Sequence, residues 1–166
     1  MTAPYTLVEA TSAADFELVK TLLQEYAARD LDDAQNSTIW RDLAEWPGRY
    51  APPQGCTVLA RTNDGRNKGG DTIAACAAFV ATGTDGLVEI KRVYVRDAFR
   101  RRGLARSLTL NLIDRATRAG HQTAAISTWA HNAQALALYR ELGFVPIAPF
   151  KEHTHATLVF LGRPLP

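Results

Sequence analysis

The stretch that decides the fold reads Val93-Tyr94-Val95-Arg96-Asp97-Ala98-Phe99-Arg100-Arg101-Arg102-Gly103-Leu104-Ala105. A β-branched run ends, a basic loop follows, and Gly103 opens a segment whose leucines recur at helical spacing, which predicts a strand, a loop and the start of a helix. The first N–H groups of a helix lack intrahelical partners and carry the positive end of its dipole. With three arginines, whose donors match phosphate, they predict a pyrophosphate site, and a solvated basic helix start is the alternative.

The segments around this stretch predict a mixed sheet. Strands at 57–61, 72–82 and 87–96 are joined by short turns and must be antiparallel, because parallel pairs need a long crossover. The helix at 103–119 leads to a strand at 123–129, and this βαβ unit makes 87–96 and 123–129 parallel.

The two ends of the chain add further elements. The remaining predicted elements are a strand at 5–10, a helix from Thr11-Ser12 through Arg29, a short helix at 38–46, a helix at 132–142, and strands at 144–150 and 156–161 around a loop at 151–155. Polar loops are expected at 31–37 and 63–70. The whole predicts one α/β domain over residues 1–166, with a mixed, mainly antiparallel sheet of about seven strands and four helices packed on it.

Composition excludes several classes of protein. The chain has 166 residues, 46% hydrophobic and 22% charged, the balance of one globular domain. It contains no apolar run long enough for a membrane span and no signal-peptide pattern at its start. Two cysteines, Cys56 and Cys76, are too few for a disulfide scaffold, and no spacing typical of a metal site occurs. We expect a cytoplasmic protein without a metal.

The net charge of +2 is unevenly distributed. Residues 89–106 hold seven basic and two acidic side chains, a local charge of +5 that leaves −3 for the other 148 residues. Residues 1–55 hold nine acids and four bases. A nucleic-acid-binding module using residues 89–106 is the alternative from another class, but such a protein would carry further basic stripes.

Three motifs resemble those of the GNAT superfamily of N-acetyltransferases. Arg100-x-x-Gly103-x-Ala105 is similar to its coenzyme A signature, and residues 89–95 are similar to its fourth strand. The third match comprises Asn132, Ala135, Leu138-Tyr139 and Leu142-Gly143-Phe144. One departure is Asp97, where many members carry proline, which affects the stiffness of the turn. The resemblance implies the acyl-CoA N-acyltransferase fold and direct acetyl transfer to an amine.

The resemblance also implies how acetyl-CoA would be held. Backbone groups of Val93 and Val95 would pair with the pantetheine arm like an added strand, because the family's strands splay apart beyond this point. Asn132 would contact the arm from the other side of the cleft. The phosphates would be bound by the loop residues Arg100, Arg101, Arg102, Gly103, Leu104 and Ala105, through backbone amides from Arg101 onward and through the arginine side chains where these are not simply solvated.

Two residues match catalytic positions of the family. Tyr139 would be the general acid that protonates the leaving thiolate; the alternative is a core aromatic on a packed helix face. Glu89 would be the general base, with a pKa raised by desolvation; the alternative is an ion pair with Lys91 on the same face of the strand. No nucleophilic cysteine is implied.

The acceptor amine is not decided by the sequence. The region 29–46 offers acids and aromatics that suit a cationic small molecule, or else a solvated loop with core tryptophans: Asp30, Asp32, Asp33, Trp40 and Trp46. His153 and His155 are candidates for substrate contact or for a surface loop. A non-catalytic acyl-CoA sensor on the same fold, and a homodimer, also stay open.

Overall fold

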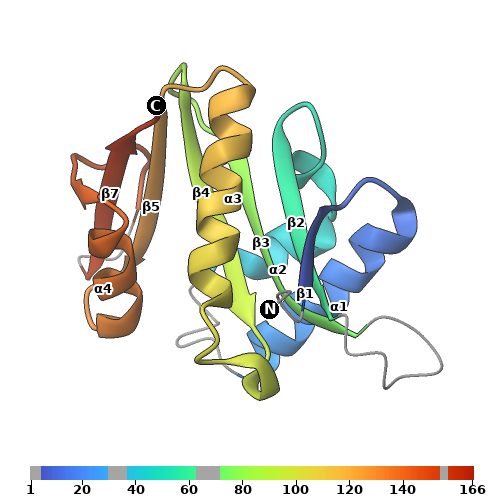
Figure 1. Ribbon diagram of the computed structural model, residues 1–166. Helices are drawn as coiled ribbons and strands as arrows, with labels where there is room; N and C mark the ends of the chain where they lie inside the picture. Colours follow the sequence, from blue (N-terminus) through green and yellow to red (C-terminus); the bar gives the residue numbers. More distant parts are fainter. Residues whose placement is uncertain (1–4, 30–36, 63–71, 154–156) are drawn as a thin grey trace.

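The computed structural model describes residues 5–29, 37–62, 72–153 and 157–166. Within them lies a seven-stranded sheet with four α-helices (Figure 1). The helices are α1 (Ala13–Arg29), α2 (Ile39–Ala44), α3 (Leu104–Arg118) and α4 (Ala133–Glu141), with 3-10 turns η2 (Gly48–Tyr50) and η3 (Asp97–Phe99). The strands are β1 (Tyr5–Glu9), β2 (Gly55–Thr62), β3 (Ile73–Ala81), β4 (Leu87–Val95), β5 (Thr123–Trp129), β6 (Val145–Pro146) and β7 (Leu158–Pro164).

The order β1-β2-β3-β4-β5-β7-β6 confirms the predicted mixed sheet. All neighbouring pairs are antiparallel except β4 and β5, which are parallel as the βαβ pattern predicts. That parallel pairing joins only residues 87–89 to residues 123–125. Beyond Glu89 and Ala125 the two strands separate, as Figure 1 shows, and each leaves one edge unpaired toward the other.

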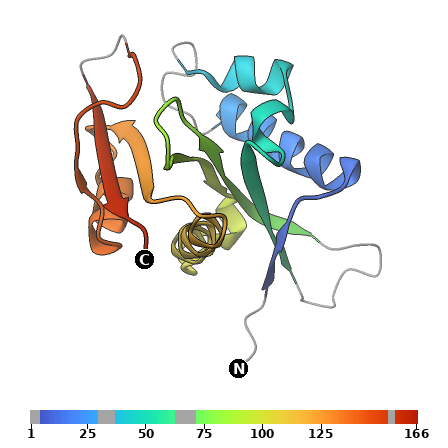
Figure 2. The same ribbon diagram turned by 90° about the horizontal axis from the view of Figure 1, so that it is seen from above.

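Helices cover both faces of the sheet (Figure 2). The apolar stripe of α3, including Leu104 and Leu108, packs with Val58 and Ile90. On the opposite face α1 and α2 pack on the sheet around Leu59. β4 therefore lies between two buried layers, one on each face of the sheet.

A bulge changes the direction of side chains in β4. Cys76 pairs with Tyr94 and Ala78 with Lys91, so two residues of β4 lie opposite one residue of β3. Arg92 lies in this bulge with a φ of 59°. Without it Lys91 and Arg92 would face opposite sides of the sheet, but both side chains approach Asp42 on α2.

Two predicted strands need correction, and three predicted loops fall wholly or partly outside the described residues. The strand predicted at 144–150 is limited to β6, because Pro146 and Pro149 lack the N–H groups that a ladder needs. The last strand runs from Leu158 to Pro164 rather than over 156–161. The predicted loop at 63–70, most of that at 31–37, and the end of that at 151–155 are not among the described residues.

Among the residues that the structure describes, no helix combines the length and the apolar character needed to cross a bilayer.

Candidate active site

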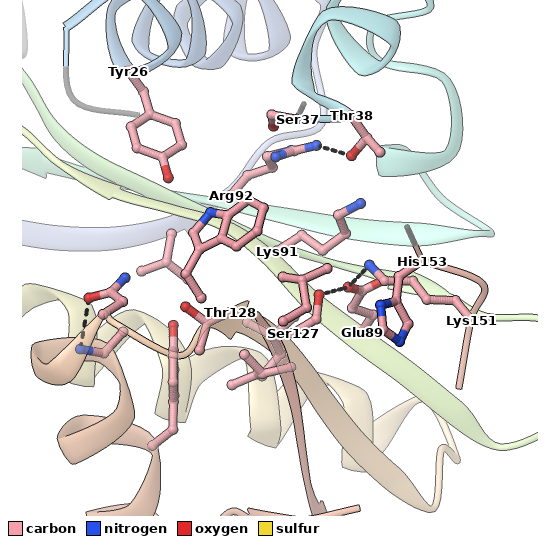
Figure 3. Close-up of a pocket in the computed structure, with 18 of the residues that line it drawn as sticks. Tyr26, Ser37, Thr38, Glu89, Lys91, Arg92, Ser127, Thr128, Lys151 and His153 are labelled. Atoms are coloured by element: carbon pink, nitrogen blue, oxygen red, sulfur yellow. Dashed lines mark hydrogen bonds and ion pairs between the residues drawn. The ribbon is translucent and has the colours of Figure 1, made fainter. Parts of the chain in front are cut away.

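A cavity of about 1190 Å³ lies where β4 and β5 separate. Its walls come from both strands, from α1, α2 and α4, from the first turn of α3, and from the segment that precedes β7. Figure 3 shows how these elements direct their side chains into the same space. Glu89 and Tyr139, the two residues singled out for catalysis, both line it.

Glu89 is the last residue of β4 that pairs with β5. Its side chain is buried, with 5% exposed, and Oε1 accepts hydrogen bonds from Ser127 Oγ at 3.0 Å and Lys151 Nζ at 2.5 Å. The ion pair is thus with Lys151, 62 residues away in sequence, whereas Lys91 lies 4.0 Å from Asp42. The alternative of a Glu89–Lys91 pair on an exposed face is therefore wrong: the carboxylate is buried and held by groups from two other segments.

Tyr139 lies on α4, with its ring edge-on to that of Phe144 at 5.7 Å between centroids. The helix ends two residues later, at Glu141, and the N–H of Phe144 donates to the carbonyl of Tyr139 at 2.9 Å. This tight helix end explains why a Gly-Phe pair follows the tyrosine. Burial raises the pKa of Tyr139 well above its ordinary value, so the hydroxyl stays protonated at neutral pH.

Three of the residues assigned to the cofactor line the cavity: Val93, Ala105 and Asn132. Asn132 is the N-cap of α4, where Oδ1 accepts from the N–H of Ala135 at 3.3 Å. The cap uses only this oxygen, so the NH2 group of the Asn132 side chain, with its two donors, takes no part in it. The other assigned residues, Val95 and 100–104, lie outside the lining of the cavity.

The loop before α3 is held by its own side chains. Arg100 Nε donates to the carbonyl of Val95 at 3.0 Å, and its Nη1 lies 2.7 Å from Asp97 Oδ1. Arg102 lies over the ring of Phe99 at 5.7 Å. Asp97 and Arg100 thus form an ion pair across this turn.

The N-terminus of α3 is open. Its N-cap is Gly103, with φ 75°, and no side chain caps the helix. A Cβ built on Gly103 would meet no atom within 4 Å, so the backbone there can be approached closely. Buried Leu104 anchors the first turn in the core. This is the geometry in which backbone N–H groups bind an anion.

A buried charge cluster behind the cavity was not predicted. Asp42 on α2 is 4% exposed and accepts from Arg92 Nη2 at 2.5 Å, from Arg92 Nε at 3.1 Å, and from the hydroxyl of Tyr50. Burial opposes its ionisation, but the charges of Arg92 and Lys91 outweigh that effect and lower the pKa of Asp42. The sequence contains a pattern that indicates this buried acid: the spacing of Ile39, Asp42 and Leu43 puts Asp42 on the apolar face of a helix.

Lys91 is the most perturbed cation of the site. Its side chain is 9% exposed and lines the cavity. Burial, and next the charge of Arg92, lower its pKa to about 7. Two consecutive basic residues within a strand break the expected alternation, and this could have indicated the bulge that brings both to one face.

The residues proposed for the acceptor are only partly in the site. Asp30, Asp32, Asp33 and His155 are not among the residues that the structure describes, whereas His153 lines the cavity. Trp40 and Trp46 do not line it. Trp46 packs on Phe16 and Tyr50 and donates from Nε1 to the carbonyl of Phe16, so it belongs to the core.

Neither cysteine belongs to this site. Cys56 and Cys76 are both buried and absent from the lining of the cavity. Burial raises the pKa of each thiol to about 12, which leaves almost no thiolate at neutral pH.

Comparison with known proteins agrees with this geometry. A model of the acetyltransferase (GNAT) family matches residues 17–144. An uncharacterized N-acetyltransferase of Schizosaccharomyces pombe is 27% identical over 147 residues, which cover 89% of this chain and 86% of that protein. The structure of YncA from Salmonella typhimurium, solved with its cofactor acetyl-CoA, superposes with a TM-score of 0.72 at 22% identity, covering 99% of this chain and 95% of that one. A GNAT-family acetyltransferase of Staphylococcus aureus Mu50 gives 0.73 at 15% identity, with 98% and 99% covered.

Proposed function

Because the chain belongs to the acetyltransferase (GNAT) family, we propose that it transfers the acetyl group of acetyl-CoA directly to a primary amine within a ternary complex. One observation carries the proposal: β4 and β5 separate at Glu89, and the cavity that opens there is lined by a buried carboxylate and a buried, protonated phenol. A base and an acid facing one space are what amine attack and thiolate departure need.

The free edge of β4 supports a place for the pantetheine arm. The N–H of Arg96 donates to the carbonyl of Ala74 on β3, and backbone groups alternate in direction along a strand. The groups of Val95 therefore point to the opposite edge, toward the opening, and Val93, which follows Arg92 in the bulge, lines the cavity. The carbonyl of Val95 already accepts from Arg100, so its N–H and the groups of Val93 are those we assign to the arm, with the amide of Asn132 facing them.

The loop and the first turn of α3 support a pyrophosphate site. We assign the phosphates to backbone amides from Arg101 to Ala105, because the uncapped helix start presents N–H groups and Gly103 leaves room for close approach. Arg100 acts differently from Arg101 and Arg102: its bonds to Asp97 and Val95 hold the shape of the loop.

The chemistry follows from the two buried groups. Glu89 accepts one proton from the acceptor ammonium, the neutral amine attacks the thioester carbonyl, and Tyr139 donates its proton to the sulfur as the C–S bond breaks. The second proton that the nitrogen loses returns the Tyr139 phenolate to the phenol. The products are an N-acetyl amine and coenzyme A. Lys151 and Lys91 lie in the same half of the cavity, and their positive charges favour the neutral form of a bound amine.

Calorimetry and a thiol-release assay test the proposal. We expect acetyl-CoA to bind with a micromolar dissociation constant, roughly −8 kcal/mol, and at least one member of a panel of primary amines to release coenzyme A. Binding without release from any amine would favour the acyl-CoA sensor. Nanomolar DNA binding at physiological salt, with no acetyl-CoA binding, would favour the nucleic-acid module.

A further inference from the structure

The two halves of the cavity differ in charge. The half formed by α3 and α4 is lined by Ala105, Asn132, Gln134, Ala135, Leu138 and Tyr139, none of which carries a full charge at neutral pH. The opposite half, formed by α2, η2, β4 and the segment before β7, is lined by five cationic side chains and two acidic ones. An uncharged wall suits the pantetheine arm, so the cations face the space left for the acceptor.

Most of these cations already have partners. Arg92 is bound by Asp42 and by Thr38 Oγ1 at 2.8 Å, and Lys151 is bound by Glu89. Arg49 Nη2 lies 3.5 Å from Asp42 Oδ1, and Arg41 is exposed to solvent. Lys91 differs in being buried without a close partner: among the described residues, the nearest acidic group to its Nζ is that of Asp42 at 4.0 Å, beyond hydrogen-bonding distance. Figure 3 shows it between the Arg92–Thr38 pair and the Glu89–Lys151 pair.

A buried ammonium in this position is incompletely compensated. The charges around it are Arg92 and Glu89 on its own strand, Asp42 on α2, and Lys151 on the segment before β7. Asp42 already forms an ion pair with Arg92, and Glu89 already forms one with Lys151. A buried charge is stable only when it is paired, and burial, followed by the charge of Arg92, lowers the pKa of Lys91. A ligand anion would supply the missing charge.

We propose that the acceptor is a small amine that also carries a carboxylate, as an amino acid does, and that Lys91 binds this carboxylate. The inference rests on the proposed N-acetyltransfer, in which Glu89 receives the amine. Glu89 and Lys91 are two residues apart on one face of β4, so their Cα atoms are separated by roughly 7 Å. An ammonium and a carboxylate a few bonds apart can reach both side chains. One lysine supplies one compensating charge, which matches a monoanion.

Matched triplets of acceptors test this inference: leucine, leucinamide and 3-methylbutylamine, and the same three forms of phenylalanine. We expect kcat/KM to be at least tenfold higher for the amino acid than for either relative. The amide is the stringent comparison, because its amine has the lowest pKa and is the most reactive at neutral pH. A preference for the amino acid over the amide therefore cannot come from the supply of neutral amine.

The variant Lys91→Met is the second test of the inference, since methionine keeps the approximate length of the side chain and removes its charge. We expect the ratio of kcat/KM for leucine to kcat/KM for 3-methylbutylamine to fall about tenfold or more, because any effect of the lost charge on amine protonation applies to both acceptors. Lys20→Met on α1, outside the cavity lining, is the control and should behave as the parent.

The outcomes separate the two proposals. Equal or better turnover of the amide and of the decarboxylated amine overturns the carboxylate inference and leaves N-acetyltransfer standing. If no amine releases coenzyme A, the proposed function fails, and the inference is then decided by titrating leucine and phenylalanine into protein saturated with coenzyme A. Binding that Lys91→Met abolishes supports the carboxylate site, and absence of such binding overturns it.

Discussion

The two halves of the cavity are built in different ways. The uncharged half comes from α3 and α4 together with the apolar end of β4 at Val93, which follow each other between residues 93 and 141. The charged half combines α2, η2, the bulge of β4 and the segment before β7, which lie far apart in sequence. One half is a helix start and a free strand edge, and depends on backbone geometry. The other is a set of buried side-chain charges, and depends on tertiary contacts.

This difference in construction determines which amino-acid substitutions each half of the cavity tolerates. A site made of backbone groups is insensitive to the identity of most of its side chains, except where bulk or dihedral angles interfere. A site made of buried charges fails when one charge is removed, because the others lose their compensation. The predictions that follow test this contrast, from the largest expected effect to the smallest.

Asp42→Asn should have the largest effect, on stability. The change leaves Arg92 and Lys91 buried without their carboxylate and should lower the free energy of unfolding by about 3–5 kcal/mol, measured by urea denaturation at pH 7. The folded pKa of Asp42 is lowered, so its contribution is complete above the ordinary value of about 3.9 and is lost as the pH falls through the lower folded pKa. A deficit that does not shrink in acid would show that Asp42 acts by shape alone.

Tyr139→Phe should act on rate alone. The ring still packs on Phe144, so the fold and the affinity for acetyl-CoA should persist. Loss of the proton donor should lower kcat on the order of 10²-fold or more, about 2.7 kcal/mol. The measurement is steady-state kinetics at the pH optimum together with calorimetry of acetyl-CoA binding. An unchanged kcat would show that Tyr139 is a core residue and not the proton donor.

Glu89→Gln should change both the rate and its pH dependence. The amide keeps the shape and the contact with Ser127 but cannot accept a proton, so activity near neutral pH should fall about 10²-fold. It should partly recover at high pH, where more acceptor amine is already neutral.

Lys151→Met is the matched control for Glu89→Gln, because it removes the same ion pair and leaves the carboxylate. Its pH profile should keep the rising limb that Glu89→Gln loses, at a shifted pH because the site has lost one positive charge. Identical profiles for parent, Glu89→Gln and Lys151→Met, with full activity, would reduce Glu89 to a structural residue.

The sequence predicted the two halves unequally, for physical reasons. The helix start at Gly103 and the parallel strands around it follow from local spacing, and both are confirmed by the structure. The Glu89–Lys151 contact joins residues 62 apart, and the Arg92–Asp42 contact joins residues 50 apart. No local pattern specifies such pairs. The acids at 30–33 suggested a cationic acceptor, whereas cations predominate among the described residues of the acceptor half.

Gly103→Val should have the smallest effect on the protein and tests the backbone half. Valine at a φ of 75° is strained by about 1–2 kcal/mol, so weaker coenzyme A binding by this variant alone could come from the strain and not from the added bulk. Gly120, at the other end of α3, has a φ of 87° and equally open surroundings. Gly120→Val therefore carries the same strain without bulk at the proposed phosphate site. Both variants should lose similar stability, and only Gly103→Val should weaken coenzyme A binding, by roughly tenfold or about 1.4 kcal/mol. Equal affinity of the two variants for coenzyme A would move the phosphates away from the start of α3.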